Sequence, residues 1–232
     1  LAVLWEWIAL AVVPGYRLMF SACGSAVGVS ALLAWLNRPI AAVMLIGLGA
    51  LAAAIFAPSG RRGWITAGIG YAGALLLAPV LLRDDLAYGF GAILLLFAVV
   101  WTTDVLGYFA GRAIGGPKLW PAVSPKKTWS GAVAGVLGAM LVAVLAASYF
   151  GGFNRTAIAV IALILSVVSQ AGDLLESWIK RYFGAKDASQ LIPGHGGVMD
   201  RLDGFWAAAI VACLIGLLRG GFDAPARGLL VW

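Results

Sequence analysis

The sequence predicts an all-α, polytopic transmembrane helical bundle of about 8 helices, within a range of 7–9. Its composition is 62% hydrophobic and 11% charged, and its mean hydropathy is +0.98. Soluble domains are typically about 45–50% apolar and about 25% charged. Several apolar runs also reach the roughly 20 residues that a helix needs to cross a bilayer. We therefore expect a single integral membrane domain over residues 1–232.

The apolar runs predict the spans in order. Residues 1–13 are apolar but too short for a complete span, and Pro14-Gly15 ends them. Proline, glycine and charged residues separate the following runs, because such residues interrupt apolar helices. Full spans are expected over residues 16–36, 39–57, 64–82, 86–110, 129–150, 156–179 and 203–219. The long polar segments 111–128 and 181–202 are expected to be loops.

The positive charges predict an orientation. If successive spans cross the membrane in alternating directions, segments 61–62, 111–128 and 180–202 lie on one side. Eleven Lys and Arg residues then fall on that side, against five on the other side. Basic loops face the cytoplasm, so both long polar loops are placed there. The net charge of +6 is attributed to these loops, and no motif indicates a nucleic-acid partner. Cys23 and Cys213 lie in apolar runs and are expected to be buried, neither in a disulfide nor in a metal site.

Half of the ten acidic residues fall in the window 173–203. Asp173, Glu176 and Lys180 have the spacing that puts them on one face of a helix. Asp200 and Asp203 would likewise share a face at the start of the next helix. The segment between them contains Pro193-Gly194-His195-Gly196-Gly197, which must form a loop. Charges beside apolar spans indicate a functional site, and carboxylates suit Mg²⁺ bound together with phosphates.

The run Ser177-x2-Lys180-Arg181-x4-Lys186-Asp187-x-Ser189-x2-Ile192-Pro193-x-His195-Gly196-Gly197-x2-Asp200-Arg201-x-Asp203 resembles the signature of phosphatidate cytidylyltransferases. An upstream block is similar to the same family; it includes Asp104, Gly107, Gly111-Arg112, Lys118-Leu119 and Ser124-Pro125-x-Lys127-Thr128-Trp129-x-Gly131. Ser130 departs from it, since members often carry Glu or Gln there. The resemblance covers residues 101–206, which we take as the catalytic region, with residues 1–100 as N-terminal spans.

The resemblance implies transfer of CMP from CTP to phosphatidate, giving CDP-diacylglycerol and pyrophosphate at the cytoplasmic face of a bacterial inner membrane. The phosphate of phosphatidate is already an anionic nucleophile, so the main task is to neutralise two polyanions. The residues expected to be catalytic are Asp173, Lys180, Asp200 and Arg201. Expected substrate contacts are Arg112, Ser124, Lys126, Lys127, Arg181, Lys186 and His195. Expected Mg²⁺ ligands are Asp173, Asp200 and Asp203, followed by Asp104 and Glu176, and a second cation is left open.

Structural interpretations compete with several of these roles. Asp173 and Asp200 are also suited to ion pairs with Lys180 and Arg201, and Glu176 to an i,i+4 pair with Lys180. Asp203 is equally suited to capping a helix, and Asp104 to pairing with Arg112. The basic residues also serve as a positive-inside flank.

Two other functions remain open. A CTP-dependent polyprenol kinase, or a cytidylyltransferase for another lipid phosphate, would need similar charges. An ion-coupled transporter would instead use Asp104, Asp173 and Glu176 as an intramembrane relay. Helix faces rich in Gly and Ala permit a homodimer.

Overall fold

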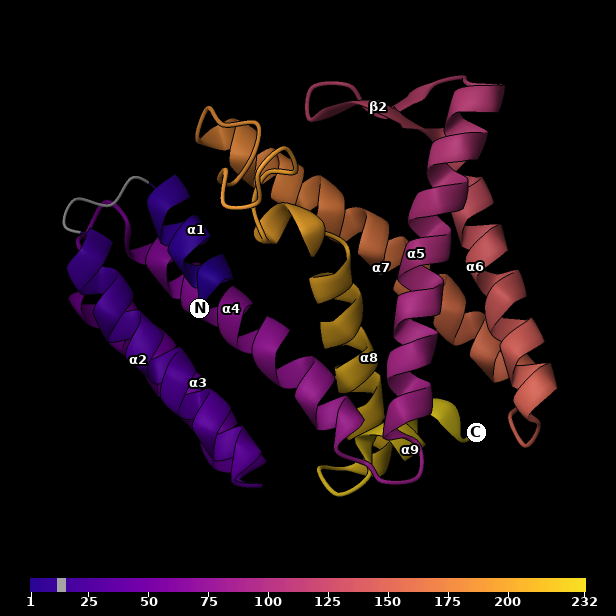
Figure 1. Cartoon of the computed structure of the whole chain (residues 1–232), viewed down its shortest axis with the longest axis horizontal. Coiled ribbons are helices and arrows are strands. Elements are labelled where there is room, and N and C mark those ends of the chain that lie inside the picture. The colour runs from indigo at the N-terminus through magenta and orange to yellow at the C-terminus, as the bar shows by residue number, and fades with distance from the viewer. Residues whose placement is uncertain (12–15) are drawn as a thin grey trace. The chain divides into compact units, whose positions relative to one another are not determined.

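The protein is a bundle of apolar helices with one small β-hairpin, as seen in a computed structural model that describes residues 1–11 and 16–232 (Figure 1). The helices of the described residues are α1 (Ala2–Leu10), α2 (Tyr16–Trp35), α3 (Pro39–Phe56), α4 (Arg62–Arg83), α5 (Gly89–Ile114), α6 (Trp129–Phe150), α7 (Arg155–Tyr182), α8 (Phe205–Gly220) and α9 (Pro225–Leu230). A short 3-10 helix, η1, covers Met199–Arg201. The break predicted at Pro14-Gly15 lies outside the described residues.

Five of these helices, α3 to α7, are long and apolar enough to cross a membrane. Two shorter apolar segments are Met19–Trp35, which lies within α2, and Phe205–Gly220, which is α8. The prediction of a polytopic helical membrane bundle is therefore confirmed, and most spans begin and end within a few residues of the predicted positions. The agreement has a physical cause, since a spanning backbone must satisfy its own hydrogen bonds over a continuous apolar run.

The chain forms two compact units. One contains Leu1–Val80 and Ile179–Leu202, and the other contains Leu81–Trp178 and Asp203–Trp232. Two of the three boundaries fall inside α4 and α7, so each of these helices contributes residues to both units, and the third lies between η1 and α8. The expected signature is divided in the same way, because Ser177 and Asp203 belong to the second unit and Lys180 to Arg201 belong to the first.

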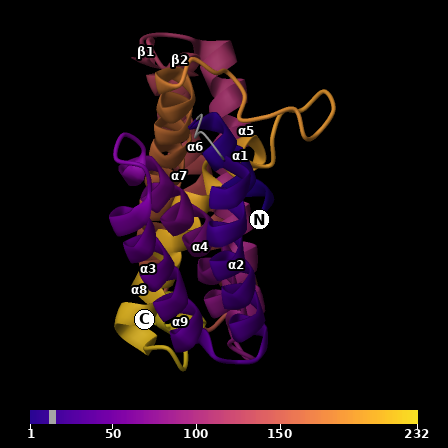
Figure 2. The same ribbon diagram turned by 90° about the vertical axis from the view of Figure 1, so that its left-hand side faces the viewer.

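In the first unit, aromatic residues connect α1, α4 and the end of α7. The indole Nε1 of Trp7 donates to the carbonyl oxygen of Trp64 at 2.8 Å. The ring of Trp64 lies 4.8 Å from that of Phe183, centroid to centroid. Helices α2 and α3 run side by side as a helical hairpin (Figure 2), with the Ser30 hydroxyl donating to the carbonyl of Ala42 at 3.2 Å. Trp64 of α4 thus contacts both α1 and the residue that follows α7.

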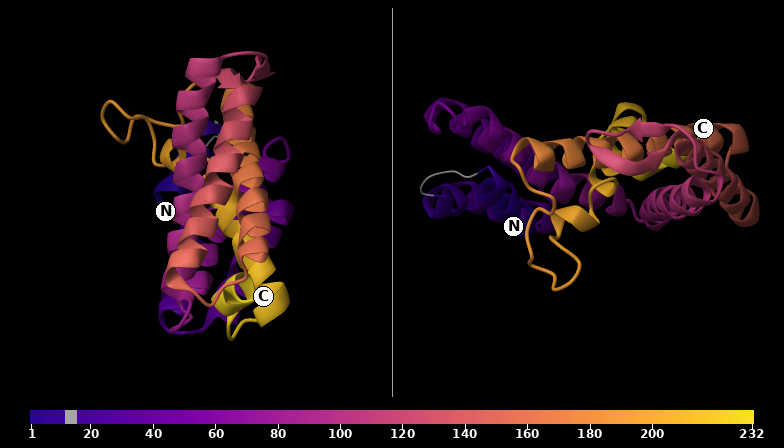
Figure 3. Two further views of the ribbon diagram at one scale, coloured as in Figure 1. Left: turned by 90° about the vertical axis from the view of Figure 1, so that its right-hand side faces the viewer. Right: turned by 90° about the horizontal axis from the view of Figure 1, so that it is seen from above.

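In the second unit, glycines allow α5 and α6 to pack closely (Figure 3). A Cβ atom added at Gly131 would lie 2.5 Å from the carbonyl oxygen of Gly107, and one at Gly135 would lie 2.7 Å from that of Thr103. Small residues at such contacts are how membrane helices approach one another. The hydroxyl groups of Thr103 and Ser166, 2.7 Å apart, join α5 to α7. The Gly-rich face of α6 is thus used inside the chain.

The structure corrects the expected loop over residues 111–128. Helix α5 continues to Ile114, and strands β1 (Lys118–Trp120) and β2 (Ser124–Thr128) then form an antiparallel hairpin. Helix α5 ends where Gly115 adopts a φ of 69°, a value that glycine reaches without strain. The amide of Trp129 donates to the carbonyl of Pro117 at 3.1 Å and closes the base of the hairpin. The hairpin therefore holds its lysines on an ordered backbone.

A second correction concerns the start of α8. Asp200 lies in η1 and Asp203 precedes the N-cap residue, Gly204, so the two aspartates do not share a face of an α-helix. The reason is local. The carboxylates of this segment bind nearby backbone amides, and such bonds favour turns over a continuous helix.

Candidate active site

A lysine–carboxylate pair joins the hairpin to α7 in the second unit. The ammonium group of Lys127, on β2, contacts the carboxylate of Asp173, on α7. Thr128 follows Lys127 and caps α6, accepting a hydrogen bond from the amide of Gly131 at 3.2 Å. The side chains of Lys127 and Asp173 remain 30% and 19% exposed, respectively. The pair is thus both anchored and accessible.

Ser130 also helps to hold the hairpin. Its hydroxyl donates to the carbonyl oxygen of Gly115 at 2.5 Å and lies 3.0 Å from the hydroxyl oxygen of Thr128. The serine therefore connects the end of α5 with the start of α6. In this chain, the position at which the sequence departs from the family pattern fixes the segment that carries Lys127.

Two further aspartates belong to the same unit. Asp104, on α5, interacts electrostatically with both Asp173 and Lys127. The carbonyl oxygen of Asp203 would lie 3.3 Å from a Cβ atom at Gly172, the residue before Asp173. The carboxylate of Asp203 accepts a hydrogen bond from the amide of Gly204 at 2.8 Å. Helices α5 and α7 and the start of α8 thus bring Asp104, Asp173 and Asp203 to one part of the second unit.

This set of donors is chemically suited to Mg²⁺. No group of three or more potential ligands is arranged as a metal site within residues 1–11 and 16–232. Mg²⁺, however, commonly takes only one or two protein carboxylates and completes its coordination with water and substrate phosphates. Asp104 and Asp173 interact electrostatically, so they are the candidates for such a pair of carboxylates. The metal ligands expected from the sequence remain a prediction.

The second lysine–carboxylate pair lies in the first unit. The Nζ atom of Lys180 is 2.5 Å from Oδ1 of Asp200, and both side chains are less than 10% exposed. The other oxygen, Oδ2, accepts hydrogen bonds from the amides of Ala188 at 2.9 Å and Gly197 at 2.8 Å. Asp200 therefore joins the end of α7 to both limbs of the loop that follows.

These contacts change the acidity of Asp200. Burial alone would raise the pKa of its carboxyl group, but the hydrogen bonds from Lys180, Gly197 and Ala188 outweigh burial and lower the pKa below the ordinary value of 3.8. Asp200 is therefore ionised at neutral pH, and it keeps the neighbouring ammonium group in place.

Glu6 is a site residue that the sequence analysis missed. It lies on α1, is fully buried, and accepts hydrogen bonds from Ser189, Val198 and Met199. The only available signal was an acidic residue in an otherwise apolar segment, since the bonded partners lie more than 180 residues away in the sequence.

The other expected contacts are mostly exposed. Arg112 donates to the hydroxyl of Tyr108 at 3.1 Å, and Arg181 donates to the carbonyl of Ala185 at 2.9 Å. Ser124 is half-buried on β2, whereas Glu176 is completely buried on α7. Exposed side chains also include Lys126, Lys186, His195 and Arg201. Their substrate roles remain predictions.

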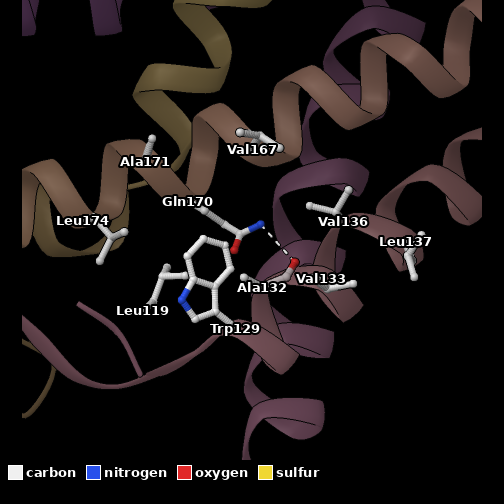
Figure 4. Close-up of a pocket in the computed structure, with 10 residues that line it drawn as sticks. All are labelled: Leu119, Trp129, Ala132, Val133, Val136, Leu137, Val167, Gln170, Ala171 and Leu174. Atoms are coloured by element: carbon white, nitrogen blue, oxygen red, sulfur yellow. Dashed lines mark hydrogen bonds between the residues drawn. The ribbon is translucent and has the colours of Figure 1, made fainter. Parts of the chain in front are cut away.

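An apolar groove lies beside the Lys127–Asp173 pair in the second unit. It has a volume of about 420 Å³ and is lined by α6, α7 and Leu119 of the hairpin. Figure 4 shows Trp129 at the hairpin end, with Val133, Val136 and Leu137 on α6. Gln170 of α7 supplies a polar group, and its amide nitrogen lies 3.4 Å from the carbonyl oxygen of Ala132. Leu174, the residue after Asp173, also lines the groove. Helix α7 thus carries Asp173 and lines the groove with the residue that follows it.

The fold and these pairs define a multi-pass membrane protein that carries ordered lysine–carboxylate pairs at the ends of apolar helices. Comparison with known sequences then identifies its family. The family model described as "Cytidylyltransferase family" matches residues 1–218. The chain belongs to the cytidylyltransferase family.

Individual relatives agree with this assignment. The chain is 53% identical to a phosphatidate cytidylyltransferase of Brucella suis over 164 residues, which are 71% of this chain and 61% of that protein. It is 43% identical to the Rickettsia felis protein of the same name over 134 residues, 54% of this chain and 59% of the relative. It is 44% identical to the Staphylococcus aureus protein of the same name over 119 residues, which are 50% of this chain and 45% of the relative. The matched segments thus span about three fifths or less of these relatives.

Proposed function

We propose that the protein transfers the CMP group of CTP to phosphatidate and releases pyrophosphate. The observation that carries the proposal is that Lys127 of the upstream block and Lys180 of the downstream signature each contact an aspartate, Asp173 and Asp200 respectively. Membership of the cytidylyltransferase family and the names of the relatives support the same reaction.

In this reaction, a phosphate oxygen of phosphatidate attacks the α-phosphorus of CTP. The bond from that phosphorus to the oxygen bridging to the β-phosphate breaks, and pyrophosphate leaves. The nucleophile is already an anion at neutral pH, so the chain need not supply a nucleophilic side chain. Its task is to place positive charge around two polyanions. Lys127 and Lys180 suit this task, because their carboxylate partners hold both ammonium groups in defined positions.

We further propose that the reaction depends on Mg²⁺ held by Asp173 with Asp104 or Asp203. The cation would neutralise phosphate charge and stabilise the leaving pyrophosphate. The supporting observation is the repulsion between Asp104 and Asp173, which a bound cation would relieve.

The lipid part of the substrate suits the groove. Its lining is apolar apart from Gln170, and it includes Trp129 and Leu174, which lie close in sequence to Lys127 and Asp173. Acyl chains in the groove would leave the phosphate at the charged end. The site would face the cytoplasm of a bacterial inner membrane, where CTP is available, as the distribution of basic residues favours. A homodimer also remains a prediction.

The test is pyrophosphate release by purified protein in detergent, with CTP, phosphatidate and MgCl₂. Wild-type protein should release pyrophosphate only when all three are present, and Asp173→Asn should abolish most of the release. Lys118→Met is the matched control, because Lys118 is exposed on β1, the partner strand of β2, and is not among the expected substrate contacts. Absence of release from folded wild-type protein would refute the proposed reaction, and full activity of Asp173→Asn would remove Asp173 from it.

A further inference from the structure

The carboxylate of Glu6 is bonded on both oxygens to the loop that follows α7. Oε1 accepts hydrogen bonds from the hydroxyl of Ser189 at 2.6 Å and from the amide of Val198 at 2.8 Å. Oε2 accepts one from the amide of Met199 at 2.7 Å. Glu6 has no exposed surface. A buried carboxylate with three short bonds is an anchor, because breaking any of them would leave a donor or a charge without a partner.

The anchored residues lie on both limbs of the loop. Ser189 is on the outgoing limb, whereas Val198 and Met199 are on the returning limb at the start of η1. Asp200 links the same limbs through the amides of Ala188 and Gly197. Two carboxylates therefore close the loop, and one of them, Glu6, comes from a helix at the other end of the sequence.

Gly197 shows how closely the loop follows Glu6. A Cβ atom at this position would lie 2.5 Å from Oε1 and 2.9 Å from the carboxyl carbon of Glu6. A side chain therefore does not fit between the loop and the carboxylate. The close approach of the loop to Glu6 therefore explains why Gly197 of the signature is a glycine.

We propose that Glu6 is a positioning residue for cytidylyl transfer. It holds the returning limb of the loop, and with it Asp200, in the place where Asp200 binds Lys180. Glu6 does not contact the substrates. The proposal rests on the proposed function for its kinetic consequence, but the ordering of the loop by Glu6 can be tested without any substrate.

The experiment compares Glu6→Gln with Trp7→Phe. Glutamine keeps the size of the side chain but replaces one acceptor oxygen with a donor group, which would face an amide or hydroxyl donor. Trp7→Phe is the matched control, since it removes a hydrogen bond between α1 and α4 without touching a residue of the loop. Glu6→Asp is included as the conservative variant that keeps the charge.

The first measurement is limited trypsin digestion in detergent, with mass spectrometry of the products. Cleavage after Lys186 and Arg201, both exposed, reports on the loop. We expect Glu6→Gln to be cleaved there at least about tenfold faster than wild type, because local opening exposes the backbone. Trp7→Phe should be cleaved at the wild-type rate. Equal rates for Glu6→Gln and wild type would overturn the proposal.

The second measurement is steady-state kinetics. We expect Glu6→Gln to lower kcat at least about tenfold, since small displacements of positioned groups are costly in catalysis. Glu6→Asp should recover part of that loss, and Trp7→Phe should keep near-wild-type kcat. Equal losses of kcat in Glu6→Gln and Trp7→Phe would show that Glu6 acts only through general stability. If wild-type protein released no pyrophosphate, the proposed function would fail, and the trypsin comparison would still decide whether Glu6 orders the loop.

Discussion

Single residues show how this chain keeps charges beside apolar helices. Lys127 and Lys180 each contact an aspartate, and Asp200 also binds two backbone amides. An unpaired charge at such a position would be costly, so pairing lets the charges persist. The same pairing orders the ammonium groups, which is what binding a polyanion requires.

Removing the ammonium group of Lys127 tests whether an ordered lysine of the hairpin binds the polyanionic substrates. We expect Lys127→Met to lower kcat/KM by about 100-fold, the usual effect of losing a group that stabilises charge in the transition state. The measurement is pyrophosphate release over a range of CTP and phosphatidate concentrations. Lys118→Met, on the other strand of the hairpin, should change kcat/KM less than about threefold, because a solvated lysine contributes little. Similar losses in the two variants would indicate a general effect of positive charge on the hairpin.

Asp200 should make the stability of the loop sensitive to acid. Its folded pKa lies below the unfolded value of 3.8, so its stabilising contribution is complete above that value and is lost as the pH falls through the folded pKa. We expect the midpoint temperature of thermal unfolding, followed by tryptophan fluorescence, to decrease as the pH falls below about 4. Asp200→Asn should be less stable at neutral pH and should show a smaller acid-dependent decrease. The same decrease in both proteins would assign it to other carboxyl groups.

At the scale of elements, the glycines between α5 and α6 set the position of the hairpin. We expect Gly135→Ala to destabilise the protein by about 1–3 kcal/mol, because the new methyl group would lie 2.7 Å from the carbonyl oxygen of Thr103. The measurement is thermal unfolding in detergent. Gly47→Ala is the control, since no atom lies within 4 Å of the added Cβ on α3. An unchanged midpoint in Gly135→Ala would contradict the close packing.

The groove between α6 and α7 makes a prediction about the lipid. Val133→Trp should fill the groove and raise KM for long-chain phosphatidate by roughly fivefold, equivalent to about 1 kcal/mol of binding free energy. Short-chain phosphatidate and CTP should keep their KM values. Leu141→Trp, at an exposed position of α6 outside the groove lining, is the control. If both variants affected long-chain phosphatidate equally, the groove would not be its binding site.

At the scale of the whole molecule, hydropathy predicted the spans but not the contacts that build the site. A span must be a continuous apolar run, and this constraint is local in sequence. Lys127 and Asp173 are 46 residues apart, and Glu6 meets Met199 across 193 residues. Only folding brings these residues together. The β-hairpin was missed for a different reason, because strands of 3 and 5 residues are too short to show an apolar alternation.

The orientation of the molecule makes a prediction of its own. We expect an impermeant maleimide to label Asp84→Cys in intact spheroplasts, and Lys126→Cys only after lysis, because the basic hairpin should face the cytoplasm. Both replaced residues are exposed, and the native Cys23 and Cys213 are buried. Labelling of Lys126→Cys in intact spheroplasts would reverse the orientation and place the site on the wrong side for CTP.

The most direct test of the central claim is the fate of labelled phosphate from CTP. Purified wild-type protein would be incubated with phosphatidate, MgCl₂ and CTP labelled with ³²P at either the α- or the γ-position, and the lipids would then be extracted. The proposed reaction predicts that the α-label enters the lipid and the γ-label leaves as pyrophosphate. Lipid that carried the γ-label would show a kinase, and unlabelled lipid in both arms would contradict the account.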